Sequence, residues 1–374
     1  MTAMAARPLG VRTLVLDPDA ACAAAGVADG VLVAPFEDAT MARELGLRAD
    51  VVSVELERIP VPSLAAAAAH APLRPSAEVL GVIRDRAAQK RWLEGHGIPL
   101  GPWRAATDAA TTRAAIAALG MPCRVKATVG GYDGRSQVRV TTAEEAASAW
   151  DALGAESVVV ERELALASEC SVLVARSPRG EVRVHPPARN WHEHGILVRS
   201  MLPSGLPEPI EARAIAIARE LAASLGIEGL LVVECFVTED GAVLVNELAP
   251  RPHNSFHHAG LACATSQFEQ FVRAVGDLPL GDTTLVQPVA LANLLGDLWR
   301  GDAPPPFARA LAVPGVRIEL YGKAPRPKRK VGHLMSAGRD AADALARLER
   351  KVAPGYRGFT TDFAPSVTLE TTLP

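Results

Sequence analysis

The sequence carries a pair of glutamates, Glu234 and Glu247, placed symmetrically about the dipeptide Asp240-Gly241. Asp-Gly is a strong signal for a two-residue hairpin turn, and a turn centred there makes the two glutamates directly opposed. Opposed residues share one face of a sheet, so their carboxylates repel unless a cation lies between them. Mg²⁺ suits this pair because it takes oxygen ligands and keeps positions for water and phosphate. The alternative is that one Glu takes a proton or pairs with an Arg such as Arg251.

A glycine-rich loop is the second candidate. The residues Gly130, Gly131, Tyr132, Asp133 and Gly134 lie between two expected strands, so they do not form a Walker A loop, which would open a helix. Their backbone N–H groups can still cover phosphates, although such a loop is more often only a turn. Lys126, just before the loop, is a candidate phosphate ligand. Lys90 lies on an expected helix, where a solvated face is the competing interpretation.

Two further clusters contain polar groups. The segment Lys323 to Lys330 holds five cations and fits a solvated loop, a nucleic-acid patch or a substrate-phosphate site. His253, Asn254, Ser255 and His257 follow the Glu247 strand on a loop, where binding groups commonly collect. Two histidines without a third ligand at suitable spacing argue against structural zinc.

The elements that position these residues alternate between strands and helices. At the N-terminus, a buried strand at 11–17, an alanine-rich helix and strands at 31–33 and 51–54 predict a doubly wound parallel sheet ending near Gly81. Further on, the patterns predict helices at 85–94, 211–225 and 340–351, strands at 123–127, 137–140 and 157–161, hairpins at 170–185 and 230–247, and a capping box at Thr141 and Glu144.

The whole-chain composition is that of a folded protein. Its 374 residues are 49% hydrophobic and 22% charged, with a formal net charge of -3, and this length predicts two or three domains. The balanced charge argues against wholesale binding of nucleic acid or an acidic membrane, and the apolar runs are too short to cross a bilayer. Five cysteines without a C-x-x-C pair favour reduced thiols and a cytoplasmic location.

Taken together, these segments resemble the ATP-grasp superfamily and, within it, the N5-carboxyaminoimidazole ribonucleotide synthetases. The resemblance rests on an ordered set of stretches: GGYDG, VNELAPRPHNS (245–255), TSQFEQ (265–270), LPLGDT (278–283), NLLGD (293–297), YGK (321–323) and RKVGH (329–333). It implies a mixed α/β chain with an ATP-grasp fold. The expected domains are a truncated pre-ATP-grasp domain at 1–84, a small subdomain with the flap at 85–165, a large subdomain with the Mg²⁺ site at 166–300 and a C-terminal domain with the basic loop at 301–374.

The resemblance also implies roles for individual residues. ATP would be contacted by Lys90, Lys126, the loop from Gly130 to Gly134, Glu161 at the adenine hinge, Glu169 at the ribose, and Asn246. Glu234 and Glu247 would hold Mg²⁺. Arg251, His253, Asn254 and Ser255 would frame bicarbonate and carboxyphosphate, while Lys323, Arg329 and Lys330 would bind the phosphate of the ribonucleotide.

The implied activity is ATP-dependent carboxylation of aminoimidazole ribonucleotide with bicarbonate, by a cytoplasmic homodimer that binds neither nucleic acid nor membrane. Another ATP-grasp carboxylate-amine ligase and a non-catalytic nucleotide-binding paralogue are the alternatives. Relative to the family pattern, the first strand and its glycine loop are absent, which predicts either an upstream start codon that encodes them or an N-terminal sheet that is gapped or re-paired. Arg135, Ser136, Phe256 and His258 also depart from the pattern, which bears on flap and pocket shape.

Overall fold

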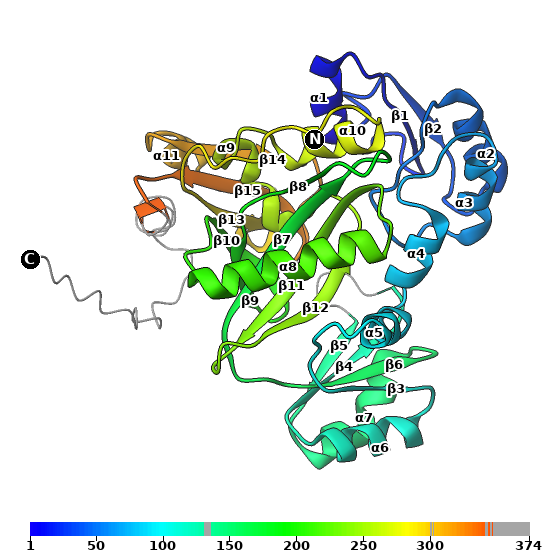
Figure 1. Cartoon of the computed structure of the whole chain (residues 1–374), viewed down its shortest axis with the longest axis vertical. Coiled ribbons are helices and arrows are strands. Elements are labelled where there is room, and N and C mark those ends of the chain that lie inside the picture. Colours follow the sequence, from blue (N-terminus) through cyan, green and yellow to red (C-terminus); the bar gives the residue numbers. More distant parts are fainter. Residues whose placement is uncertain (131–135, 300, 302, 341–342, 345, 347–374) are drawn as a thin grey trace, which may run out of the picture.

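The computed structural model describes residues 1–130, 136–299, 301, 303–340, 343–344 and 346. The loop residues 131–135 and most of the helix expected at 340–351 lie outside this part of the chain. Three sheets of two, four and nine strands form the framework, and Figure 1 shows them as separate layers with helices against them. No helix in the described ranges has the length and apolarity to cross a membrane.

The N-terminal unit has a two-stranded parallel sheet in which β1 (Leu14–Asp17) pairs with β2 (Gly30–Val33). The prediction of an alanine-rich helix after β1 is wrong, because that segment forms turns. The strand expected at 51–54 is also wrong, since only Val52 forms an isolated bridge, to Leu73. The helices of the unit are α1 (Thr2–Ala6), η1 (Arg7–Leu9), α2 (Ala39–Arg48), α3 (Val61–Ala68) and α4 (Ala77–Ile83).

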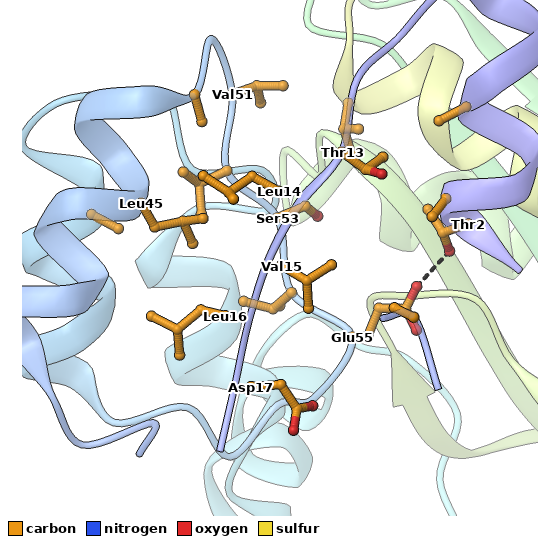
Figure 2. A pocket seen from close by; sticks show the side chains of 18 of the residues that line it. Thr2, Thr13, Leu14, Val15, Leu16, Asp17, Leu45, Val51, Ser53 and Glu55 are labelled. Atoms are coloured by element: carbon orange, nitrogen blue, oxygen red, sulfur yellow. Dashed lines mark hydrogen bonds between the residues drawn. The ribbon is translucent and has the colours of Figure 1, made fainter. Parts of the chain in front are cut away.

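The strand β1 is half-buried along its whole length, although its composition predicts full burial. Its second edge faces a groove of about 1140 Å³ that separates it from residues 51–55, as Figure 2 shows. The sheet is therefore gapped at this edge, which is one of the outcomes that the family pattern predicts.

The four-stranded sheet has the order β3 (Trp103–Ala106), β6 (Val158–Arg162), β4 (Cys123–Ala127), β5 (Gln137–Val140). Along β4 the side chains alternate, so that Cys123 and Val125 enter the core while Lys126 lies on the other face. Helices α6 (Ala109–Leu119) and α7 (Ala143–Leu153) cover the core face, and α5 (Arg86–Gly95) leads into the sheet. The capping box of α7 uses Thr142 and Glu145, one residue later than predicted.

The nine-stranded sheet is antiparallel and buried on both faces. Within β7, Val172 and Val174 join the core that contains Ile217 of α8, while Leu173 joins the core that contains Phe271 of α10. Its strands are β7 (Leu166–Arg176), β8 (Val182–Val184), β9 (Ala188–Glu193), β10 (Ile196–Leu202), β11 (Gly229–Thr238), β12 (Val243–Ala249), β13 (Val289–Leu295), β14 (Val316–Leu320) and β15 (Lys330–Ala337). The other elements are α8 (Glu208–Ser224), η2 (Asn254–Phe256), α9 (Ala259–Ala262), α10 (Gln267–Val275), η3 (Gly296–Leu298) and α11 (Phe307–Leu311).

The order of the main path is β12-β11-β7-β9-β10-β13-β15-β14, with β8 paired to β7. The sheet therefore continues across residue 300, and the C-terminal strands β14 and β15 extend the same sheet that carries the glutamate hairpin. This continuity brings the basic segment, which lies between β14 and β15, back to that sheet.

The contact between α2 and α3 gives a test of the fold. A Cβ atom added at Gly46 would lie 2.5 Å from the Ala67 carbonyl oxygen, so Gly46→Ala should lower the thermal midpoint through overpacking of about 1–3 kcal/mol. Gly81, inside α4, has open space around it, so Gly81→Ala should instead raise the midpoint by reducing backbone entropy in the unfolded chain. Midpoints that move in the same direction would contradict this packing.

Candidate active site

The hairpin of β11 and β12 places Glu234 directly opposite Glu247, as the sequence predicts. The turn itself differs from the prediction. Thr238 donates its N–H to the Ala242 carbonyl, which leaves a three-residue loop with Gly241 in the left-handed region at a φ of 83°.

A β-bulge restores the pairing between the two glutamates. Cys235 pairs with Val245, whereas the next pair along is Glu234 with Glu247, so Asn246 is the additional residue. Without this bulge the three-residue loop would place Glu234 opposite Asn246. Bulges redirect side chains next to functional sites, and here the bulge brings two carboxylates together.

Burial makes Glu234 the unusual member of the pair. Its side chain is 14% exposed, against 44% for Glu247. Burial first, and then the charge of Glu247, raise the pKa of Glu234 to about 7, while His192 and Lys330 act in the opposite direction. At neutral pH, a proton or a cation beside Glu234 would therefore relieve the repulsion between the two carboxylates.

The donor set around Glu234 is suited to a hard cation. Two carboxylates face each other, and the Asn246 amide lies beside them, with its Nδ2 atom 3.4 Å from a Glu234 oxygen. Within the described residues no cluster of three or more His, Cys, Asp and Glu side chains could hold a metal. Two opposed carboxylates are a donor set that Mg²⁺ can use, because this ion needs few protein ligands.

His253 is held in a defined orientation beside Glu234. Its Nδ1 atom accepts the Ser255 N–H, so the ring proton is on Nε2, which lies 3.4 Å from Glu234. Burial and then Arg251 keep the pKa of His253 well below 6.5, so the ring is neutral. Gln267 fixes the backbone by accepting the His253 N–H and donating to its carbonyl, each at 2.9 Å.

Lys90, Lys126 and Glu161 form a buried ion cluster on the facing sheet. The Lys90 and Lys126 ammonium groups lie 2.9 and 2.6 Å from the Glu161 carboxylate. Burial alone would raise the pKa of Glu161, but the two lysines outweigh it and hold the pKa at about 2. The solvated alternative for Lys90 is wrong, because this residue is 5% exposed.

A small cavity of about 20 Å³ lies between the ion cluster and the hairpin. Lys90, Glu161, Phe236 and Asn246 are among the residues that line it. Glu161 and Asn246, which are both predicted to contact ATP, therefore line the same cavity.

Two ion pairs connect the glutamate strand with other units, and sequence reasoning missed both partners. Arg251, which the alternative interpretation would pair with a metal-site Glu, donates from Nε to Glu57 of the N-terminal unit at 2.7 Å. Arg86, at the start of α5, lies 4.0 Å from Glu247 and donates to the Ala127 carbonyl at the end of β4. No local pattern marks either residue, because each acts on a segment far away in the sequence.

A polar network supports the floor of the site. Asn190 donates to Ser171, which is the β7 partner of Glu234, and Ser200 lies 2.9 Å from Asn190 Oδ1 and 3.1 Å from the Ser255 carbonyl. All of these groups are buried, so their hydrogen bonds fix the strand and loop positions.

Glu169 lies next to this network on β7. His192 Nδ1 is 2.8 Å from its carboxylate. Burial alone would lower the pKa of His192, but the hydrogen bond and charge of Glu169 raise it above 6.5.

The basic segment contributes one cation to the hairpin. Lys330, the first residue of β15, is close enough to lower the pKa of Glu234 and of His253. Lys323 is exposed and lies over the Tyr321 ring at 5.5 Å, while Arg329 donates to the Ala324 carbonyl. Among the predicted phosphate ligands, Lys330 is thus brought close to Glu234.

Within the predicted flap, Gly130 is described and adopts a φ of 79°, which favours glycine. Gly131, Tyr132, Asp133 and Gly134 lie outside the described residues, so their proposed contacts with ATP stay predictions.

Family comparisons cover the chain in three successive regions. Residues 1–84 match the ribonucleotide synthetase preATP-grasp domain, 91–268 the ATP-grasp domain and 289–347 the phosphoribosylaminoimidazole carboxylase C-terminal domain. The N5-carboxyaminoimidazole ribonucleotide synthase of Brucella melitensis is 38% identical over 337 residues, covering 89% of this chain and 92% of that protein. The chain belongs to the N5-carboxyaminoimidazole ribonucleotide synthase family. It is an ATP-grasp ligase by this membership.

Solved structures of the N5-carboxyaminoimidazole ribonucleotide synthase family agree with the fold. The enzyme of Thermus thermophilus superposes with a TM-score of 0.85 at 34% identity, covering 94% of this chain and 95% of that one. The enzyme of Aspergillus clavatus in complex with ADP and 5-aminoimidazole ribonucleotide gives 0.84 at 27% identity, covering 94% of each chain.

Two departures from the family pattern lie in the protein interior. Phe256 and His258 are fully buried, and their rings meet edge to face. His258 Nε2 is 3.1 Å from Ser200 Oγ, and burial lowers the pKa of His258 to about 3. His258 is thus linked to the loop at Ser255 through the hydroxyl group of Ser200.

The Lys90–Glu161–Lys126 cluster predicts a pH-dependent stability. Glu161→Gln removes the shared counter-charge of two buried ammonium groups, so unfolding free energy should fall by about 3–5 kcal/mol at neutral pH. Because the folded-state pKa of about 2 lies below the ordinary 4.5, the contribution of Glu161 is present above pH 4.5 and is lost as pH falls toward 2. Thermal midpoints of wild type and variant should converge over that window.

Glu163→Gln is the matched control for this experiment. Glu163 pairs with Arg139, a half-exposed side chain, so its loss should cost about 1 kcal/mol or less. A similar decrease in unfolding free energy in both variants would show that the buried ion cluster stabilises the fold no more than the exposed ion pair does.

Proposed function

We propose that this chain uses ATP to carboxylate 5-aminoimidazole ribonucleotide with bicarbonate, forming N5-carboxyaminoimidazole ribonucleotide, ADP and phosphate in purine biosynthesis. The observation that carries the proposal is the pairing of Glu234 with Glu247 next to His253 and Lys330. This arrangement combines a site for a divalent cation with a cation for a substrate phosphate. The substrates named for the Aspergillus clavatus relative support the same assignment.

The reaction has two steps. A bicarbonate oxygen attacks the γ-phosphorus of ATP, and the bond to ADP breaks, which gives carboxyphosphate. The 5-amino nitrogen of the ribonucleotide then takes the carboxyl group, directly or as released CO₂, and phosphate leaves. Exclusion of water protects the carboxyphosphate between the steps.

Each group of residues has a separate task in this scheme. Lys90 and Lys126 contact the ATP phosphates. Glu161 lies at the adenine, Glu169 meets the ribose, and Asn246 also contacts the nucleotide. When bound by Glu234 and Glu247, Mg²⁺ would neutralise charge on the phosphates. The loop residues Arg251, His253, Asn254 and Ser255 frame bicarbonate, and the neutral His253 ring orients without adding charge.

Another ATP-grasp carboxylate-amine ligase would use the same glutamate pair with a different acceptor. Product analysis with labelled bicarbonate separates it from our proposal, because only carboxylation retains the label in the ribonucleotide. A non-catalytic paralogue would bind nucleotide without releasing ADP. The retained Glu234, Glu247, Lys126 and Arg251 argue against that alternative.

The glutamate pair predicts a selective loss of turnover. Glu247→Gln should still bind ADP or ATP but lower ADP release about a hundredfold or more, because charge neutralisation is needed chiefly in the transition state. ADP release with and without the ribonucleotide and bicarbonate provides the measurement. Glu239→Gln, at the exposed hairpin loop, is the control and should keep full activity. Full activity in Glu247→Gln would remove the metal-site assignment.

The basic segment predicts an effect on one substrate. Lys330→Glu should raise the ribonucleotide KM roughly 10–100-fold with little change in ATP affinity, since one charged phosphate contact is lost. Lys328→Glu, in the same segment and exposed, should change neither constant. Equal losses for both substrates would indicate damage to the fold. Salt-sensitive DNA binding that both variants abolish would favour a nucleic-acid patch.

We also propose that the chain acts in the cytoplasm as a homodimer, as the family resemblance implies. The four buried free cysteines, Cys123, Cys170, Cys235 and Cys263, are compatible with a reducing compartment. Sedimentation of the purified chain tests the dimer.

A further inference from the structure

The ion pair between Arg251 and Glu57 joins the active-site loop to the N-terminal unit. Arg251 follows β12 on the segment that leads to His253, while Glu57 lies in a turn of the N-terminal unit. The Nε atom of Arg251 is 2.7 Å from Oε1 of Glu57, and the two side chains are only 11% and 21% exposed. Breaking such a pair is costly, because either charge alone would be left poorly hydrated. The N-terminal unit thus supplies a firmly held partner to a residue of the active-site loop.

Two acceptors fix the plane of the Arg251 guanidinium. Glu57 accepts from Nε, and the Pro252 carbonyl accepts from Nη1 at 3.2 Å. A guanidinium is planar and its N–H groups have fixed directions, so bonds from two of its nitrogens determine its orientation. After burial, the Arg251 charge is the next largest cause that lowers the pKa of His253. The guanidinium is therefore held in one orientation, with its charge close to the His253 ring.

The segment that carries Glu57 is itself tied to the nine-stranded sheet and its helices. Its Val52 carbonyl accepts the Arg74 N–H at 2.9 Å. The Arg74 side chain then donates from Nε to Glu228, just before β11, at 2.9 Å and from Nη1 to the Val275 carbonyl of α10 at 2.7 Å. The place of Glu57 is thus set by the way the whole N-terminal unit packs on this sheet.

We propose that Glu57 is a positioning residue for bicarbonate, which holds the Arg251 guanidinium in the orientation that receives this anion. The inference rests on the proposed function, which assigns Arg251 to bicarbonate. A carboxylate-like anion matches the guanidinium fork only when the plane of the fork is correctly turned. The bicarbonate subsite is therefore complete only when the N-terminal unit is packed against the active-site loop.

The contribution of Glu57 is orientation and not charge. Its carboxylate is negative and would repel bicarbonate, so it favours binding only through the geometry that it imposes on Arg251. An uncharged acceptor of the same length should therefore serve as well as Glu57. A shorter carboxylate should serve poorly, because it keeps the charge but withdraws the acceptor from Nε.

The competing explanation is that the pair only fastens the N-terminal unit to the rest of the chain. The Arg74–Glu228 pair is a matched fastening, with an N–O distance of 2.9 Å and side chains that are 17% and 38% exposed. Glu228 directly precedes β11, whereas Glu234 lies within that strand. At about 3.3 Å per residue along a strand, Glu228 is roughly 20 Å from Glu234. Glu228→Ala therefore removes a comparable ion pair without touching the active-site loop.

The test measures ADP release by full-length variants while bicarbonate and ATP are titrated separately in the presence of the ribonucleotide. Glu57→Ala should raise the bicarbonate KM about tenfold or more and change the ATP KM less than about twofold, since one hydrogen bond to a charged group is lost. Glu57→Gln should stay within about threefold of wild type, because its amide oxygen still accepts the Nε–H. Glu228→Ala should leave the bicarbonate KM unchanged, even where its thermal midpoint falls.

Glu57→Asp keeps the test decisive if Glu57→Ala fails to fold. It should raise the bicarbonate KM although it retains the charge, in contrast to Glu57→Gln. The positioning role is overturned if the shortened variants keep the wild-type bicarbonate KM, if Glu57→Gln is as impaired as they are, or if Glu228→Ala raises this KM equally. In those cases wild-type carboxylation still supports the proposed function. A wild-type chain whose ADP release does not depend on bicarbonate would overturn the proposed function, and this inference with it.

Discussion

Glu234 and Glu247 face each other on antiparallel strands, and burial of Glu234 leaves their repulsion poorly screened. Much of the surrounding structure can be understood as compensation for this arrangement. His192 from β9 and Lys330 from β15 both favour the charged form of Glu234, and Arg86 from α5 approaches Glu247. Three elements that are distant in the sequence thus converge on one hairpin, and the remaining imbalance is what a divalent cation would relieve.

On the four-stranded sheet, the cluster of Lys90, Lys126 and Glu161 has an excess of positive charge, whereas the glutamate pair has an excess of negative charge. Lys90 is buried and Lys126 is 12% exposed, and the two share a single carboxylate, so the cluster carries a net positive charge with little exposure to solvent. In the function proposed above, a triphosphate would meet the two lysines without new desolvation of them, because that cost is already met by the fold. The cavity between the cluster and Asn246 lies where such a ligand would join the two sheets.

The N-terminal sheet consists of the single pair β1 and β2, with a groove beside β1. With one neighbour only, β1 stays half-buried, and residues 51–55 keep extended geometry through a single bridge at Val52. The helices α2, α3 and α10 are nevertheless in place around the open space. Helices α2 and α3 pack closely on each other, as the contact between Gly46 and Ala67 shows.

The sequence by itself determined the local elements, because periodicity and turn residues act over a few positions. It predicted the helix that carries Lys90, the strand that carries Lys126 and the opposition of Glu234 to Glu247. The tertiary structure decided the rest. The bulge at Asn246 corrected a turn register that would have separated the glutamates, and the burial of Lys90 depended on a carboxylate from β6. Arg251 donates to Glu57, which lies 194 positions away in the sequence, because only the folded chain brings the two residues together. The segment at 51–54 has the composition of a strand, but only Val52 forms an isolated bridge. A strand also needs neighbouring strands to pair with, and local composition does not determine whether they are present.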